Sequence, residues 1–227
     1  MLLGVGDSSD FKQKLTDLRR SFKGENHIGS DFAGKDLSYS FLYEANFAAA
    51  NLIGTHFQNS VLHETNFTGA NLTSADLSNL SHVSSPSLFV GATLISANAT
   101  TSNFDGCSFI GADLSLANFS NSYLRGSNFR GALMYNVEFC KCDLAFCDFQ
   151  GANLNYSNLE NTDLSKSYLR GATCMYTLFC GANLSEADMS NSWFPGADFT
   201  GAKMPDGKIH KCRKNSDFIC CIEKFEI

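Results

Sequence analysis

Asp143 and Asp163 are the pair of residues whose type and spacing most directly suggest chemistry in this chain of 227 residues. The sequence repeats every five residues, so two positions 20 apart are expected to stack about 4.8 Å from each other on one outer face. Two carboxylates at such a distance resemble the pair that cleaves glycosidic bonds. The same pattern places them on a flat wall between Tyr123 and Asn183, whereas catalysis needs a concave site that excludes water. We therefore interpret the pair as part of a solvated surface.

A second group that could carry chemistry lies near the end of the chain, where His210 is followed by Cys212, Cys220 and Cys221. Histidine and cysteine are zinc ligands, but this spacing matches no standard zinc site, and we predict neither a metal nor a cofactor. No histidine falls beside a Ser or Cys nucleophile with an acidic third member. A phosphate-binding G-x-x-x-x-G-K-[ST] motif is also missing from the sequence. The sequence therefore predicts a protein that is not an enzyme.

The element that must position these residues is a repeat in which every fifth residue is Leu, Phe or a substitute for them. A first run extends from Phe32 to Leu77, and a second extends from Phe89 to Met204. The residue two positions before each apolar centre is usually Ala, Ser, Thr or Cys, so the unit reads A-(D/N)-L-x-x. A period of five fits neither a helix nor a strand. Sustained over this length, it predicts an all-β solenoid whose coils have four sides and about 20 residues.

Stacking by 20 residues groups the apolar centres into interior columns. We expect each buried Leu or Phe to stabilise the rod by about 1.5–3 kcal/mol. The predicted aromatic core comprises one column of Phe89, Phe109, Phe129 and Phe149 and another that contains Phe119, Phe139, Phe179 and Phe199.

The stretch "GANLSEADMSNSWFPGADFTGAKMPDG" shows the repeat most clearly. On the basis of this stretch, the chain resembles the pentapeptide-repeat proteins over residues 30–78 and 87–205. Its repeat is similar to their cyanobacterial-like A-(D/N)-L-x-x consensus. The segment from Met204 to His210 is similar to the "MPDG-x-IH" ending of such proteins. The resemblance implies a right-handed quadrilateral β-helix. It does not define an activity, because members of the family have unrelated functions.

The sequence divides into five parts. Residues 1–28 are expected to form an N-terminal segment with a short capping helix, since Phe11, Leu15, Leu18 and Phe22 have helical spacing. The first repeat run occupies 29–78, about 2.5 coils, and the second occupies 89–205, about six coils. Residues 79–88 form a loop that breaks the register, and 206–227 form a C-terminal tail that either caps the rod or makes a dimer.

The loop at 79–88 leaves two interpretations open. It separates two domains, or it protrudes from one continuous rod, which we favour. Loops on regular scaffolds often carry binding specificity, which makes His82 and Pro86 candidate interaction residues. The alternative is a tolerated insertion.

Composition narrows the range of functions. The formal charge of −6 disfavours direct binding of nucleic acid. No stretch has the length and apolarity of a membrane span or the pattern of a secretory signal, so we expect a cytoplasmic protein with no membrane partner. Nine cysteines suit a reducing compartment, and Cys107, Cys142, Cys147 and Cys174 fall at inward positions as small core residues.

Two functional hypotheses follow. The first is a non-catalytic scaffold or regulator that presents flat walls and a loop to an unidentified protein partner, with a homodimer through one end of the rod as an additional contact. The second is a DNA mimic that binds DNA gyrase or another topoisomerase and protects it from fluoroquinolones, as the resemblance implies. Candidate interaction residues on the walls are Tyr123, Asp143, Asp163, Arg130, Arg170 and Trp193.

Overall fold

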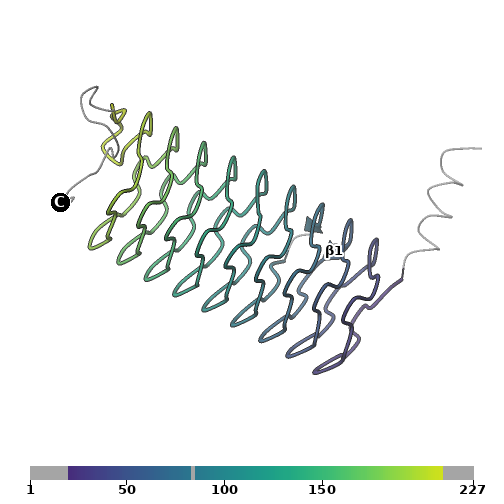
Figure 1. Cartoon of the computed structure of the whole chain (residues 1–227). Coiled ribbons are helices and arrows are strands. Elements are labelled where there is room, and N and C mark those ends of the chain that lie inside the picture. Colours follow the sequence, from purple (N-terminus) through teal and green to yellow (C-terminus); the bar gives the residue numbers. More distant parts are fainter. Residues whose placement is uncertain (1–19, 83–84, 212–227) are drawn as a thin grey trace, which may run out of the picture.

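The protein is a straight rod of stacked coils, as a computed structural model that describes residues 20–82 and 85–211 shows (Figure 1). Successive coils pair in parallel. Strand β1 (Val61–Leu62) pairs with β2 (Ser81–His82), with Val61 opposite Ser81 and Leu62 opposite His82. Single parallel bridges join residues 20 apart along most of the rod, including Asp143 to Asp163. A rod of four-sided coils therefore replaces the helices and long strands of an ordinary domain.

The coils begin earlier than the sequence pattern predicted. Ser21 already pairs with Phe41, and Asn26 pairs with Asn46, so residues 21–28 belong to the rod. Phe22, which the helical spacing included in a capping helix, is a core residue of the first coil with 5% of its surface exposed. Phe22 and His27 continue the five-residue register of Phe32, and this register prevails over the helical one. The rest of the predicted helix lies outside the described residues.

The break between the two runs interrupts the register but not the rod. Asn66 pairs with Leu88, and the pairs Asn71–Thr93 and Asp76–Asn98 keep the same offset of 22 residues instead of 20. Ser81 and His82 still belong to β2, so the irregular segment is shorter than the expected 79–88. The core continues across it, because the rings of Phe67 and Phe89 stack at 5.0 Å.

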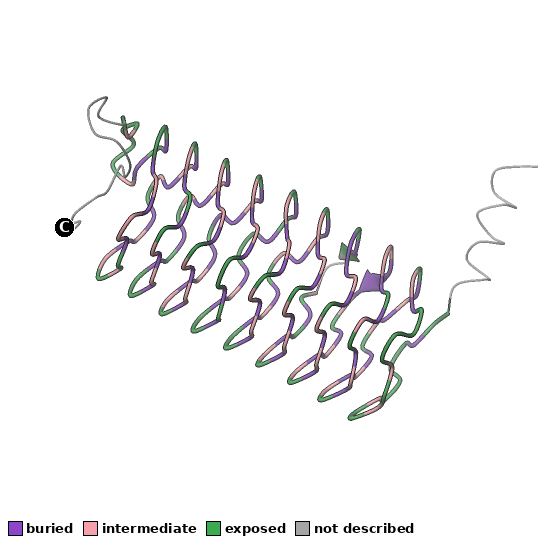
Figure 2. Ribbon diagram, in the orientation of Figure 1, coloured by how far each residue is buried: buried purple, intermediate pink, exposed green. Residues whose placement is uncertain are grey.

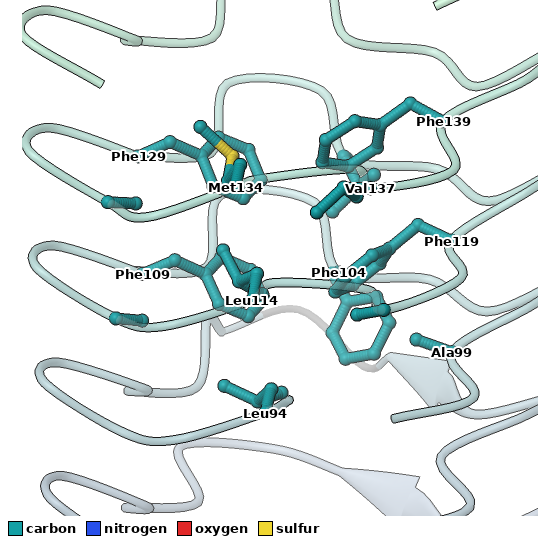
Figure 3. Packing of buried hydrophobic residues seen from close by; sticks show 14 of the residues in the cluster. Leu94, Ala99, Phe104, Phe109, Leu114, Phe119, Phe129, Met134, Val137 and Phe139 are labelled. Atoms are coloured by element: carbon teal, nitrogen blue, oxygen red, sulfur yellow. The ribbon is translucent and has the colours of Figure 1, made fainter. Parts of the chain in front are cut away.

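The interior is filled by the apolar centres of the repeat, which are buried from Leu37 to Leu77 and from Phe89 to Met204 (Figure 2). His27 and Phe32 in the first coil are half-buried. Phe109 and Phe129 lie directly above one another, as do Phe119 and Phe139 (Figure 3). One column forms an unbroken stack of rings from His27 to Phe149, with centroids 4.8–5.5 Å apart. Phe179 and Phe199 stack at 4.7 Å further along the rod. All eight phenylalanines of the predicted columns have no exposed surface.

Small polar residues on the inner side connect neighbouring coils. The Thr65 hydroxyl donates a hydrogen bond to the backbone oxygen of Leu42 at 2.6 Å, and the Ser122 hydroxyl donates to that of Ala99 at 2.7 Å. The thiols of Cys142 and Cys147 make the same contact at 2.9 Å. The donor lies 23 residues after the acceptor in each case. Ser, Thr and Cys thus serve at this position because they are small enough to fit and also donate to the coil below.

Replacing Thr65 with Val tests this contact. Val has the same shape as Thr but leaves the Leu42 oxygen without its hydroxyl donor, so we expect a loss of about 1–2 kcal/mol in the free energy of unfolding. Thr68→Val, on the outer surface, is the matched control and should change stability by less than about 0.5 kcal/mol. Equal effects of the two substitutions in urea denaturation would contradict the proposed role of the hydroxyl.

The last coil closes with a reversal of the chain. Lys208 follows a turn in which the Met204 backbone N–H donates to the Lys208 oxygen at 2.8 Å, and Ile209 then pairs antiparallel with Lys203. His210 continues this pairing with Ala202. The tail from Cys212 onward, with the predicted cap or dimer contact, lies outside the described residues. Across the described ranges, no helix has the length and apolar character required to cross a membrane.

Candidate interaction surface

The outward Asp and Asn residues of the repeat stabilise its corners. Asp143 Oδ1 accepts a hydrogen bond from the Ala145 backbone N–H at 3.1 Å, and Asp163 Oδ1 accepts one from Ser165 at 2.9 Å. Asn128 does the same with the Arg130 N–H at 3.0 Å. A side-chain oxygen that accepts from the backbone two residues later is the standard way for Asp and Asn to stabilise a turn. The preference for D/N in the consensus therefore follows from the fold and requires no acidic function.

Asp143 and Asp163 stack as expected in a column that also contains Tyr123 and Asn183. Asn183 Nδ2 donates to Asp163 Oδ1 at 2.9 Å, and Arg125 Nη1 lies 3.7 Å from Asp143 Oδ2. The two carboxylates line an open hollow of about 400 Å³ together with Tyr123. Both carboxylates therefore already have partners on the wall, which favours their interpretation as surface residues.

Hydrogen bonding lowers the pKa of other carboxylates on the walls. Ser38 donates to Asp36, and Ser190 donates to Asp188, with N···O distances of 2.9 Å and 3.0 Å for the backbone bonds. The side-chain bonds of these serines are the largest cause that lowers the pKa of each carboxyl below its usual value, and the backbone bonds come next. These wall positions therefore carry full negative charge at neutral pH.

The remaining candidate residues do not converge on one site. Arg130 and Arg170 lie at one corner of the rod with Gln150 between them, and Arg130 Nη1 is 3.6 Å from Asp148 Oδ2. Trp193 pairs with Thr173 on a different wall, with 56% of its surface exposed.

The two candidates at the break lie in yet another region. His82 is part of β2, and Pro86 is exposed beside Gly106. The sequence-based candidates are thus spread over several faces and do not define a single pocket.

The described cysteines are free thiols of the interior or its edge. Burial raises the pKa of the Cys107 and Cys142 thiols to about 12, and it also raises that of Cys147 and Cys174. Such thiols stay protonated at neutral pH, so they fill the core as small residues, and those of Cys142 and Cys147 also donate hydrogen bonds to the coil below. The tail cysteines Cys212, Cys220 and Cys221 lie outside the described residues, and no group of three or more metal-binding side chains occurs in the ranges 20–82 and 85–211.

Sequence reasoning missed two features at the corners. Phe146 lies between two cations, with the Arg125 guanidinium 4.6 Å and the Lys166 ammonium 5.6 Å from its ring centre. Tyr156 and Tyr176 extend a ladder that begins at Tyr135, with centroid distances of 5.2 Å and 5.5 Å. These positions are the unspecified x-x of the consensus. Applying the 20-residue step to them would have shown that Tyr156 and Tyr176 share a column.

The fold and its surfaces define a β-helical solenoid whose interior is filled and whose outer walls carry ordered columns of side chains. The chain belongs to the pentapeptide repeat family, as the predicted resemblance indicated. The family model for pentapeptide repeats matches eight copies, within residues 40–79, 87–126, 112–145, 142–173 and 163–201. The family is that of right-handed β-helices, so the predicted solenoid class is confirmed, while the N-terminal capping helix is not.

Solved structures with similar folds belong to the same family. HetL, a protein involved in heterocyst differentiation regulation from the cyanobacterium Nostoc sp. strain PCC 7120, is 23% identical over 90% of this chain and 99% of its own, with a TM-score of 0.46. Full-length QnrB1, a plasmid-mediated fluoroquinolone resistance protein, is 19% identical over 83% and 85% of the two chains, with a TM-score of 0.40. Rfr23 from the cyanobacterium Cyanothece 51142 is 27% identical over 38% and 58%, with a TM-score of 0.38. None of the curated proteins matches this chain.

Proposed function

We propose that this protein is a non-catalytic scaffold that binds a partner protein through the outward side chains of its rod. The observation that carries the proposal is the set of large apolar side chains held outward at fixed spacing, among them Tyr123, Tyr156, Tyr176 and Trp193 with 42–59% of their surface exposed. Tyr and Trp are the residues most enriched in the energetic centres of protein interfaces. A repeat rod presents such residues as an extended, rigid surface.

The setting we propose is a reducing, cytoplasmic one. The six cysteines of the described residues are unpaired, and four of them are buried. Free thiols in this number suit a compartment in which disulfides do not form.

The DNA-mimicking alternative requires a continuous acidic stripe along the rod. Within the described ranges, no outward column has more than two acidic residues in succession, and the column of Asp143 and Asp163 continues through Asn183 to Lys203. The salt-bridge partners Arg125 and Arg130 also reduce the negative potential of the adjacent walls. We therefore retain the general scaffold as the proposed function.

The test is capture of partners from the lysate of the source organism by the immobilised full chain and by variants of single faces. Suitable variants are R130S/R170S, W193S, D143N/D163N and Y135S/Y156S/Y176S, each checked for an unchanged melting temperature. We expect one variant to reduce retention of a specific protein at least about tenfold, as loss of an interface centre would. If all variants and the wild type retain the same proteins equally, the proposal is wrong. Inhibition of gyrase supercoiling that weakens as salt rises would instead favour the DNA mimic.

A further inference from the structure

One corner of the rod carries a ladder of three exposed tyrosines. Tyr135, Tyr156 and Tyr176 have 46%, 42% and 48% of their surface exposed, and they belong to three successive coils. The ring of Tyr156 lies 5.2 Å from that of Tyr135 and 5.5 Å from that of Tyr176, and its hydroxyl contacts Met175 Sδ at 3.8 Å. We call these three residues the tyrosine corner. Its rings support one another and are held along the rod axis.

The backbone at this corner is unfavourable for tyrosine. Tyr156 and Tyr176 have φ values of 64° and 52°, in the left-handed region where a non-glycine residue costs roughly 1–2 kcal/mol. The next residue in the column is Gly196, and a Cβ there would come within 2.5 Å of the Tyr176 ring. A glycine would adopt the left-handed φ of this corner without strain in every coil. Leu116 and Asn136 in the same column have the same left-handed φ, so this backbone conformation belongs to the fold. The two tyrosines differ from them in their stacked, exposed rings, and Gly196 leaves room for that of Tyr176.

The charges beside the tyrosine corner are all of one sign. Along the second run, the two walls that meet at this corner carry only acidic charges among the described residues, from Asp113, Glu138 and Asp198. Glu160 lies at the next corner, which it shares with Lys141. None of these four forms an ion pair within the described residues. The adjoining wall, which contains Glu138 and Asp198, also continues to Asp76 and Asp36 at the other end of the rod. A cation that approaches the tyrosines therefore meets carboxylates that form no salt bridge with an Arg or Lys of the described residues.

We propose that the tyrosine corner, together with Glu138, Glu160 and Asp198, binds a basic, extended segment of a partner protein. Arginine and lysine side chains pack on tyrosine rings through cation–π contacts and pair with carboxylates beside them. Glu138 and Asp198 are three coils apart, or about 14 Å, which an extended segment of about five residues spans. This inference rests on the proposed scaffold function and names the chemistry of the partner.

The experiment measures binding of a synthetic octa-arginine peptide to the full-length protein. Trp193 is the single tryptophan of the chain and is exposed on the wall beside the corner, so its fluorescence reports binding. Octa-lysine and octa-glutamate peptides serve as comparisons. The variants are Y135S/Y156S/Y176S and E138Q/E160Q, and the matched control is D143N/D163N, which removes the same number of charges from a different wall.

We expect octa-arginine to bind more tightly than octa-lysine, since guanidinium groups stack better on aromatic rings, and octa-glutamate not to bind. Both site variants should weaken octa-arginine binding at least about tenfold, and the control less than about twofold. Equal weakening by E138Q/E160Q and D143N/D163N would show general electrostatic attraction and overturn the site. Unchanged binding by the tyrosine variant would also overturn it. Concentration-dependent dimerisation that the tyrosine variant abolishes would identify a second copy of the chain as the occupant instead.

The two proposals fail separately. Loss of the basic-segment site with partner capture intact leaves the scaffold function standing on another face. Capture that no outward variant affects removes the scaffold function, whatever the peptide result.

Discussion

Phe129→Asp is expected to abolish cooperative folding of the central coils. The Phe129 ring has no exposed surface and lies between Phe109 and Phe149, with both centroids 5.0 Å away. Removing a buried Phe costs about 3–5 kcal/mol, and burying a carboxylate without a partner costs more. Because each coil contacts only its neighbours, the damage should extend to both adjoining coils. Circular dichroism and limited proteolysis of the variant would measure this loss.

Two controls isolate the position from the residue type. Asn128→Asp places the same carboxylate one residue earlier, on the outer wall, where its oxygen can accept from the Arg130 N–H as Asn128 does. It should retain nearly the wild-type stability. Phe129→Leu should fold with a loss of about 1–2 kcal/mol, because a Leu occupies the same column at Leu169. A Phe129→Asp variant that melts at the wild-type temperature would show that the column does not hold the rod together.

Deleting two residues should have opposite consequences at two places in the chain. Removal of Val83 and Ser84 changes the offset between paired coils at the break from 22 residues to 20, which is the offset elsewhere. We expect this variant to fold with equal or greater stability. Removal of Asn121 and Ser122 leaves two residues between the centres Phe119 and Leu124, where each step of the repeat has four. It also removes the Ser122 hydroxyl bond to Ala99.

The second deletion is expected to disrupt the coils on both sides, with a loss of most of the cooperative thermal transition. Measuring both deletions by thermal denaturation gives the comparison directly. Unfolding of the Val83–Ser84 deletion would mean that the two additional residues are required by the rod, and the interpretation of the break as a tolerated insertion would then be wrong.

Much of this architecture could be predicted from the sequence, because a period of five constrains every coil in the same way. The Phe89 and Phe119 columns follow from counting in steps of 20. The start of the rod could not be placed, since Phe22 satisfies both the helical spacing with Leu18 and the five-residue spacing with His27. Only the pairing of Ser21 with Phe41 decides between them.

The candidate surface was harder to predict for a related reason. The consensus specifies which residues point inward and which stabilise the corner. Asp143 and Asp163 were candidate site residues because of their charge, although their side chains accept hydrogen bonds that stabilise turns. Tyr156 and Tyr176 occupy positions that the consensus leaves unspecified. Their significance depends on backbone dihedral angles and ring distances, which a sequence pattern does not contain.

The hydrogen bonds from Ser, Thr and Cys to the coil below have a consequence for how such a protein changes over evolutionary time. Most of these bonds join a donor to an acceptor 23 residues earlier, or 25 residues earlier across the break, so neighbouring coils offer similar contacts to the coils above and below. An in-frame duplication or loss of one whole coil therefore meets matching contacts at both junctions. The length of the rod can therefore change in steps of one coil. A surface feature such as the tyrosine corner can in this way change its distance from either end while the core keeps the same packing.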